Sequence, residues 1–305
     1  MPFEIIAIVG PTASGKTALA LDLARALASD GHRAEIVNAD AMQLYSHMNI
    51  GTAKLSEADR LEFPHHLFDV ITPEQEMSAV QYKAIARETI DAILARGAVP
   101  IVVGGSMFYL AAALDELEFA PTDPKIRARL EGEAEQLGGT SLHDRLRQMD
   151  PITASRIPAQ NIRRVIRALE VIEITKSPYQ SQLPLPQSYR PTLWIGVSVE
   201  REQLKARIAD RVGLMWESGL VEESRQLREK FVLSRTAAVA IGYQQAFDQL
   251  DGELSPEDAQ AQTISLTSRY ARRQMSWFRR DSRIRWCPTG VDRLDFVLEQ
   301  IRLEQ

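Results

Sequence analysis

The residues with the clearest chemical meaning are Gly10 to Thr17, which read Gly-Pro-Thr-Ala-Ser-Gly-Lys-Thr. This spacing is typical of a phosphate-binding loop, because its glycines let successive backbone N–H groups point into one concavity and the following helix adds its positive end. Lys16 can then reach the outer phosphates, and the Thr17 hydroxyl can coordinate Mg²⁺. The sequence therefore predicts a polyphosphate ligand with Mg²⁺, without saying which polyphosphate. The residues expected to bind it are Gly10, Pro11, Thr12, Ala13, Ser14, Gly15, Lys16 and Thr17.

Such a loop needs a strand before it and a helix after it, and both are present. Short apolar runs alternate with helix-length segments, which predicts an α/β fold with a P-loop-like parallel sheet covered by helices. Polar residues that follow strand ends are then expected to bind ligands. We expect strands at 5–9, 34–38, 67–71, 99–103 and 192–199, and helices at 15–29, 78–96, after Gly104-Gly-Ser106, and at 201–218, 221–230, 240–250 and 256–279.

Residues 121–191 differ from the rest, with charged helical patterns, no β-branched run and a proline-rich end from Ser177 to Pro191. We interpret them as an inserted all-helical domain. The core would then be split into a first part, 1–120, and a completing part, 192–305, whose last helices are expected to contact the same partner as the insertion.

Two side chains beside the loop are candidates for chemistry. Asp40 lies two residues beyond an expected strand and can serve as a general base or an outer Mg²⁺ ligand, or merely cap a turn. Ser106 follows Gly104-Gly105 and can donate a hydrogen bond to a leaving phosphate oxygen, or act as a helix cap. Gln43 can read a base edge or simply face solvent.

His65, His66 and Asp69 suggest a metal site at first sight. Neighbouring strand residues point to opposite faces, however, and no third strong ligand is spaced for zinc, so structural hydrogen bonds are the better interpretation. The single cysteine, Cys287, excludes an internal disulfide and fits a small buried hydrophobic residue.

Arginines gather in two places. The insertion carries Arg156, Arg163, Arg164 and Arg167, and the segment from Ser268 to Arg285 has seven arginines and one acid, interleaved with Tyr270, Trp277 and Phe278. Arginine binds phosphates and aromatic faces stack on bases, so these segments are candidates for RNA binding; the alternative is a solvated helix face over buried aromatics.

The composition sets limits on function. The chain has 305 residues, 45% of them hydrophobic, and a net charge of -5, which argues against indiscriminate nucleic-acid binding through bulk charge. There is no apolar stretch of the ~20 residues needed to cross a membrane, and no secretory signal pattern. We expect a soluble, cytoplasmic protein.

Taken in order along nearly the whole chain, a set of motifs resembles the tRNA dimethylallyltransferase family. The motifs are Gly10 to Thr17, Asp40-Ala-Met-Gln43, Met48 to Lys54, Pro64 to Asp69, Gly104-Gly-Ser106, Arg167 to Val171, Ile241-Gly-Tyr243 and Arg272 to Phe278. The resemblance implies an Mg²⁺-dependent, monomeric enzyme with a P-loop core and a helical insertion. It would move a dimethylallyl group from dimethylallyl diphosphate to N6 of the adenosine at position 37, beside the anticodon of tRNA.

The resemblance also implies roles for particular residues. Asp40 would take the N6 proton, while Lys16, Mg²⁺ on Thr17 and the Ser106 hydroxyl would stabilise the departing diphosphate. Members usually carry threonine at the position of Ser106 and a basic residue at that of Gln244. Contacts to the tRNA anticodon stem-loop would fall on Asp40, Ala41, Met42, Gln43, Ser106, Arg127, Arg163, Arg164, Val165, Ile166, Arg167, Ile241, Gly242, Tyr243, Gln244, Gln245, Ala246, Gln274, Met275, Ser276, Trp277, Phe278, Arg279, Arg280 and Asp281.

Three other functions fit parts of the sequence. The phosphate-binding loop alone predicts ATP, and hence a small-molecule or nucleotide kinase whose lid the insertion would supply. A prenyltransferase that acts on free adenine nucleotides would share the same catalytic residues. A nucleotide-gated RNA-binding switch is weakened because no guanine-reading Asn-Lys-x-Asp occurs. The arginine-rich and aromatic segment favours the tRNA enzyme over the first two.

Overall fold

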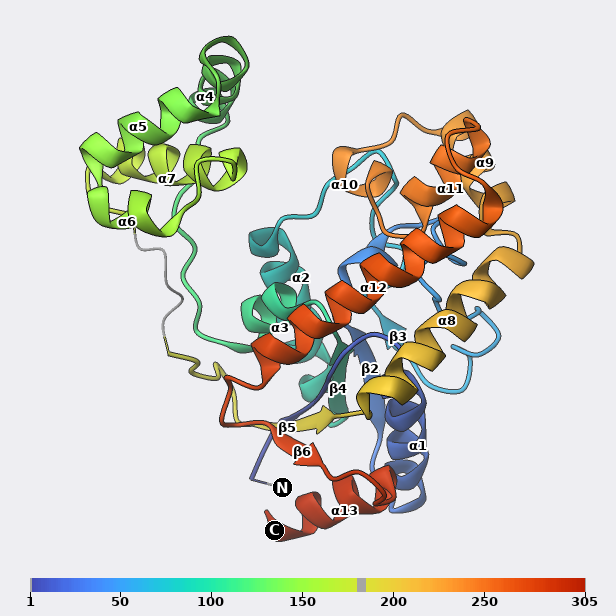
Figure 1. Cartoon of the computed structure of the whole chain (residues 1–305). Helices are drawn as coiled ribbons and strands as arrows, with labels where there is room; N and C mark the ends of the chain where they lie inside the picture. Colours follow the sequence, from blue (N-terminus) through green and yellow to red (C-terminus); the bar gives the residue numbers. More distant parts are fainter. Residues whose placement is uncertain (1, 180–184, 305) are drawn as a thin grey trace. The chain divides into compact units, whose positions relative to one another are not determined.

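The computed structural model describes residues 2–179 and 185–304. They form two compact units (Figure 1). The first, here called the core unit, comprises Met1–Glu116 and Ser188–Gln305, and the second, the helical unit, comprises Leu117–Gln187. The chain of the core unit is therefore interrupted by the helical unit.

The core unit is built on a six-stranded sheet in the order β3-β2-β4-β1-β5-β6. Every pair of neighbouring strands is parallel. The first strand pairs on one side with β4 and on the other with β5, so both parts of the core chain share one sheet. The predicted parallel α/β fold is confirmed. The strands are β1 Ile5–Val9, β2 Ala34–Asn38, β3 His65–His66, β4 Val99–Gly104, β5 Thr192–Val197 and β6 Arg285–Cys287.

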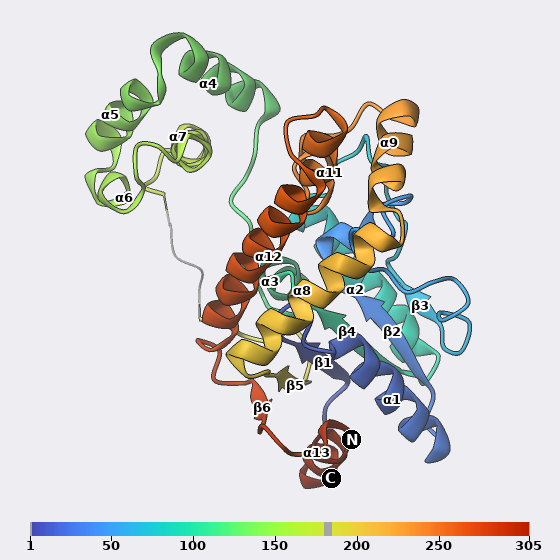
Figure 2. The ribbon, with the colours of Figure 1, turned by 45° about the vertical axis from the view of Figure 1, so that its right-hand side comes forward.

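Helices cover both faces of this sheet (Figure 2). Along β1, Ile6 and Ile8 pack into one core with α1 (Lys16–Ser29) and α13 (Arg293–Leu303). The alternate residues Ile5, Ala7 and Val9 pack into the other core, with α2 (Ala79–Ala95) and α3 (Met107–Leu114). This alternation is the expected pattern for a strand buried on both faces.

Five further helices complete the core unit. Among them α8 and α12 lie side by side, as both views show (Figures 1 and 2). A short 3-10 helix, η1 (Ala41–Leu44), directly follows β2. The five helices are α8 Arg201–Glu217, α9 Leu220–Lys230, α10 Arg235–Ala238, α11 Tyr243–Leu250 and α12 Pro256–Phe278.

The helical unit has a hydrophobic core of its own. It consists of α4 (Pro124–Leu137), α5 (Gly139–Met149), α6 (Pro151–Arg156) and α7 (Ile162–Thr175). Val165, Leu169 and Ile172 lie on one face of α7 and are buried against the other helices, which is the spacing of an amphipathic helix. Across residues 2–179 and 185–304, none of the helices combines the length and apolar character that crossing a membrane requires.

The expected strand at 67–71 is wrong. The strand is instead His65–His66. Leu67 and Asp69 have φ angles of 62° and 56°, and these left-handed angles are incompatible with an extended strand. The expected helix at 78–96 is confirmed as α2, where Ser78 and Gln81 form a capping box. The sequence reading did not identify β6 or α13.

Gly104, at the end of β4, offers a test of how tightly the ends of β4 and β2 are packed. A Cβ at this position would lie 2.2 Å from the Ala39 carbonyl oxygen, which is backbone and cannot move aside. We expect Gly104→Ala to lower the unfolding free energy of the core unit by about 3 kcal/mol in urea denaturation. The matched control is Gly213→Ala in α8, where a Cβ meets nothing within 4 Å. The control should be stabilising by about 0.5 to 1 kcal/mol, and equal losses in the two variants would contradict the packing argument.

Candidate active site

The phosphate-binding loop has the backbone that its glycines predict. Gly15 adopts φ 87° and ends the loop at the first turn of α1, while Ala13 takes φ 60°, which is unusual for a residue with a Cβ. A Cβ on Gly10 would lie 2.5 Å from the Val197 carbonyl oxygen, so the loop is closely packed against the end of β5. Strained but fixed backbone of this kind is consistent with the anion site that the sequence predicts.

Lys16 is held inside this loop. Its ammonium donates a hydrogen bond to the Pro11 carbonyl oxygen at 2.6 Å. The pKa of Lys16 is lowered to about 8, chiefly by burial; Asp40 acts to raise it, and the neighbouring Arg211 acts to lower it. A bound diphosphate would add negative charge beside the ammonium and so raise the pKa of Lys16.

The shifted pKa of Lys16 predicts proton uptake when a diphosphate binds. Above pH 8 the free protein carries mostly neutral Lys16, and the anion favours the ammonium, so binding at pH 9 should take up as much as about one proton through this side chain. Calorimetry with inorganic diphosphate in two buffers of different ionisation enthalpy measures this uptake. Lys16→Met is the control that subtracts the ligand's own titration, and the same uptake in both proteins would refute the assignment.

Asp40 both caps a turn and faces the ligand space. Its Oδ1 accepts a hydrogen bond from the Met42 amide at 3.0 Å and so starts η1. The Asn38 side chain holds the backbone at this point, because it accepts from the Asp40 amide and donates to the carbonyl oxygens of Asp40 and Leu67. The turn-capping role that the sequence left open is real, and it fixes the carboxylate at the mouth of the sheet.

Two cavities meet at Asp40. The first, of about 400 Å³, is called the loop cavity because Gly15, Lys16 and Thr17 line it. The second, of about 340 Å³, is called the helix cavity because residues of α8, α10 and α12 line it, with Ser106 and Ile241. The residues that line both are Thr12, Asp40 and Arg211. A reaction between two ligands, one in each cavity, would therefore take place beside these three side chains.

Arg211, on α8, is a site residue that the sequence reading missed. Its guanidinium donates hydrogen bonds to the Thr12 hydroxyl at 3.3 Å and to the Thr52 carbonyl oxygen at 3.1 Å. Burial lowers its pKa, and Asp40 acts in the opposite direction. No local motif surrounds Arg211, so the signal lies in the tertiary structure, which brings α8 over the phosphate-binding loop.

The segment of α12 around Gln274 lies against the same loop. The Gln274 side chain is buried, accepts from the Thr12 amide at 2.9 Å and donates to the Gly105 carbonyl oxygen at 2.8 Å. Ser106 Oγ accepts from the Ala41 amide at 2.9 Å and lines the helix cavity, as does Tyr270. Gln274 therefore orients the loop, and the Ser106 hydroxyl lies beside the Tyr270 hydroxyl, with which it hydrogen bonds.

Several residues expected to contact tRNA are instead part of the protein interior. Tyr243 is 1% exposed and donates from its hydroxyl to Glu223 at 2.6 Å, while Gln245 caps α11 and Ala246 is buried. Gly242 is buried as well, whereas Ile241 lines the helix cavity and Gln244 is exposed. The interior residues shape the site, and direct tRNA contact by their side chains is no longer part of the hypothesis.

Two arginines of the helical unit form ion pairs inside it, and two others are exposed. Arg127 and Arg167 both donate to Glu170, a carboxylate with no exposed surface, and burial acts to raise the pKa of Glu170 while these hydrogen bonds hold it below its ordinary value. Arg163 and Arg164 are exposed on α7. The side chains of Val165 and Ile166 belong to the core of this unit and are not exposed.

At the end of α12, exposed and buried residues alternate around the helix. Ser276, Arg279 and Arg280 are exposed, Met275 and Trp277 are half-buried, and Phe278 is buried. The Asp281 carboxylate accepts from Arg283, which also donates to Asp115 at 2.6 Å. Asp281 therefore serves an ion pair inside the core unit, and the exposed arginines remain the candidates for tRNA contact.

The two histidines have structural roles, as the sequence favoured. His66 Nε2 hydrogen bonds with Glu35 at 2.6 Å, and His65 Nδ1 with the Phe63 carbonyl oxygen at 2.7 Å. Within the described residues, no group of three or more histidine, cysteine or acidic side chains could hold a metal ion. Thr17 and Asp40, which both line the loop cavity, fit Mg²⁺, since this ion commonly takes few protein oxygens and the rest from a bound phosphate.

Comparison with known sequences decides the family. The family described as IPP transferase matches residues 43–281, which include the last two residues of η1, Arg211 and all of α12. The chain belongs to this family. A protein of Kineococcus radiotolerans named tRNA dimethylallyltransferase is 46% identical over 98% of this chain and 96% of its own length. A protein of Thermobifida fusca with the same name is 50% identical over 93% of this chain and 89% of its own length.

Solved structures agree with the family assignment. The full-length tRNA isopentenylpyrophosphate transferase of Bacillus halodurans is similar with a TM-score of 0.70 and 36% identity, covering 98% of this chain and 95% of that one. The tRNA delta(2)-isopentenylpyrophosphate transferase of Staphylococcus epidermidis gives 0.71 and 33%, covering 100% and 98%. The resemblance inferred from the motifs is confirmed, and the fold matches that of the family.

Proposed function

We propose that this chain transfers a dimethylallyl group from dimethylallyl diphosphate to N6 of the adenosine at position 37, beside the anticodon of tRNA, releasing diphosphate. The observation that carries the proposal is the junction of two cavities at Asp40, Thr12 and Arg211. The loop cavity suits a diphosphate, and the helix cavity gives a second ligand access to the same carboxylate. Since the proposed acceptor is a tRNA, we expect the protein to act in the cytoplasm, and we expect it to act as a monomer.

In the proposed reaction the N6 lone pair attacks C1 of the allyl group as the C1–O bond breaks. The bonding electrons leave with diphosphate, and the N6 proton goes to the Asp40 carboxylate. Because the N6 lone pair is delocalised into the adenine ring, the amine is a weak nucleophile, so a base and a well-stabilised leaving group are both needed. Asp40 is suited to this task because Asn38 and the Met42 amide fix its position.

The leaving group would be stabilised by fixed charges and donors. Lys16 and Arg211 place two cations at the loop cavity, and the loop amides add their N–H groups. Mg²⁺ bound by Thr17 would neutralise further diphosphate charge. Ser106 would donate its hydroxyl proton from the side of the helix cavity. The loop amides, Lys16, Arg211 and Ser106 already line the two cavities, so little reorganisation of the protein is needed.

The tRNA would be held by arginines on both units and by the wall of the helix cavity. Arg163, Arg164, Arg279 and Arg280 are exposed and suit phosphates. Tyr270 and Arg273 line the helix cavity, where an extruded base could stack. A metabolite kinase would have no need of these groups.

A direct assay tests the proposal against its rivals. Purified protein is incubated with radiolabelled dimethylallyl diphosphate, Mg²⁺ and unmodified tRNA, and with AMP or ATP in place of tRNA as a control. Label in tRNA alone supports the proposal. Label in the free nucleotide would favour the nucleotide prenyltransferase, and phosphate transfer from ATP to a metabolite without prenyl transfer would favour a kinase.

A further inference from the structure

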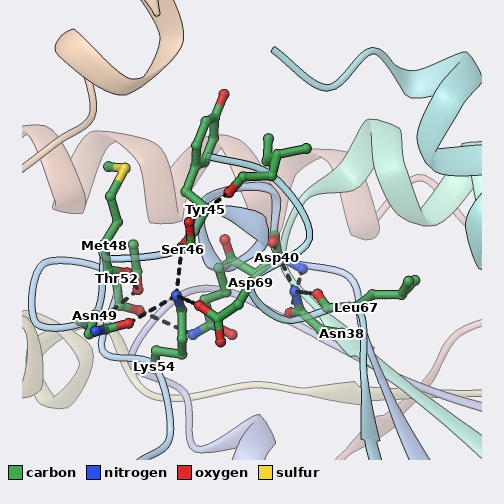
Figure 3. Close-up of polar contacts among 12 residues, drawn as sticks. Asn38, Asp40, Tyr45, Ser46, Met48, Asn49, Thr52, Lys54, Leu67 and Asp69 are labelled. Carbon is green, nitrogen blue, oxygen red and sulfur yellow. Dashed lines mark hydrogen bonds and ion pairs between the residues drawn. The ribbon is translucent and has the colours of Figure 1, made fainter. Parts of the chain in front are cut away.

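Lys54 holds together the segment that connects η1 to the rest of the core unit. Its ammonium donates to the Tyr45 carbonyl oxygen at 2.6 Å, to Asn49 Oδ1 at 3.0 Å and to Asp69 Oδ1 at 2.6 Å (Figure 3). A lysine ammonium has three donors, and all three are used here. The side chain is 1% exposed. Lys54 therefore acts on its own chain rather than on a ligand from solvent.

The backbone around Lys54 is strained. His47, Ala53, Leu67 and Asp69 have φ angles of 64°, 46°, 62° and 56°. Residues with a Cβ keep such angles only where surrounding contacts fix them, and such positions gather at functional sites. Lys54 follows Ala53 directly and bonds Asp69, so it supplies contacts of this kind.

The segment that Lys54 closes presents the Thr52 carbonyl oxygen to the active site. This oxygen accepts from Arg211 at 3.1 Å and from the Gln43 side-chain Nε2 at 3.1 Å. Thr52 is in turn held by its own hydroxyl, which donates to the Met48 carbonyl oxygen at 2.8 Å. The position of Arg211 thus depends on where the segment places Thr52.

A second clamp fixes the same segment from α9 and α11. The Glu223 carboxylate accepts from the amides of Asn49 and Ile50 at 3.1 and 3.0 Å, and from the Tyr243 hydroxyl at 2.6 Å. Glu223 holds the middle of the segment, whereas Lys54, at one end, binds Tyr45 at the other. Loss of the Lys54 ammonium should therefore let the Thr52 carbonyl oxygen shift without unfolding the segment.

We propose that Lys54 is a positioning residue: its ammonium fixes the Thr52 carbonyl oxygen and thereby sets Arg211 in place over the phosphate-binding loop. The inference rests on the proposed function, in which Arg211 stabilises the departing diphosphate. The Asp69 carboxylate supports this role of Lys54, because it forms an ion pair with the Lys54 ammonium and a second one with Arg60 at 3.1 Å.

The first test is Lys54→Met, which keeps an unbranched side chain one atom shorter and removes its donors. We expect kcat to fall about 10- to 100-fold, as small misplacements of catalytic groups do, with unchanged affinity for tRNA. Lys230→Met, at an exposed position at the end of α9, is the matched control and should behave as the wild type. An unchanged kcat in Lys54→Met would overturn the proposal.

A double-mutant cycle separates positioning from general structural support. If Lys54 acts through Arg211, adding Lys54→Met to Arg211→Met should lower kcat less than about 3-fold further. If the loss of kcat in the double variant equalled the product of the losses in the two single variants, Lys54 would act independently of Arg211, and the proposal would be overturned. If Lys54→Met does not fold, Asp69→Asn takes its place in the cycle, with the same two outcomes.

The cycle is repeated with the affinity for inorganic diphosphate, measured by calorimetry, as the readout. Non-additive losses of affinity are expected here too, and additive losses would count against the positioning role. This readout needs no prenyl transfer. A wild type that binds diphosphate but labels no tRNA would refute the proposed function, while the coupling of Lys54 to Arg211 would still be measured.

Discussion

Asp40→Asn is expected to lower kcat about 1000-fold while leaving tRNA affinity within about 2-fold of the wild type, because a general base contributes to the transition state rather than to binding. Asparagine keeps an oxygen that can accept from the Met42 amide, so η1 should retain its cap. The amide cannot accept the N6 proton. Single-turnover transfer of labelled prenyl groups measures the first quantity, and filter binding of tRNA measures the second.

The exposed Asp30 supplies the control for this experiment. Asp30→Asn removes the same charge from the surface at the end of α1, away from both cavities, and should leave turnover unchanged. A loss of tRNA affinity with normal turnover in Asp40→Asn would reassign this carboxylate to binding.

Arg211→Met should lower kcat about 100-fold, because it removes a cation from the junction of the two cavities. The guanidinium is desolvated, so its attraction to the diphosphate is screened less than it would be at the surface. The affinity for inorganic diphosphate should fall as well, by about 10-fold, in calorimetric titration. Arg211→Lys should recover part of both losses, since it keeps the charge but not the planar donors.

Arg201→Met is the corresponding control, at an exposed position at the start of the same helix. It should change neither kcat nor diphosphate affinity. If Arg211→Met bound diphosphate as tightly as the wild type, the residue would instead serve the structure of the Thr52 region.

The fold was predictable where short-range signals agree with the tertiary structure. The strand at Ile5–Val9 precedes a loop that only a strand and a helix can flank, and Ser78 marks the start of α2 by a capping box. The prediction of a strand at 67–71 is wrong because the backbone there is not extended. Leu67 and Asp69 have left-handed φ angles, and they accept hydrogen bonds from Asn38 and Lys54. Such angles depend on distant partners that a local pattern does not contain.

The candidate site was predictable to the extent that it lies on motifs. Lys16, Thr17 and Asp40 follow strand ends, and the topology of a parallel sheet brings those ends together. Arg211 lies on an amphipathic helix among other arginines, and its importance arises from the packing of α8 over the loop. The resemblance extended tRNA contact to Tyr243 and Val165, but burial distinguishes residues that shape a surface from those that form it.

The hydrogen bonds from Gln274 and Arg293 to the phosphate-binding loop have a consequence for synthesis on the ribosome. The Thr12 amide and the Ser14 carbonyl oxygen, near the start of the chain, are bound by side chains that are translated more than 250 residues later. The nascent loop thus emerges with these partners absent, and β1 also waits for β5 to complete its pairing. Ligand affinity should therefore appear late in translation, when α12 and the start of α13 have left the ribosomal exit tunnel, rather than when the loop itself does.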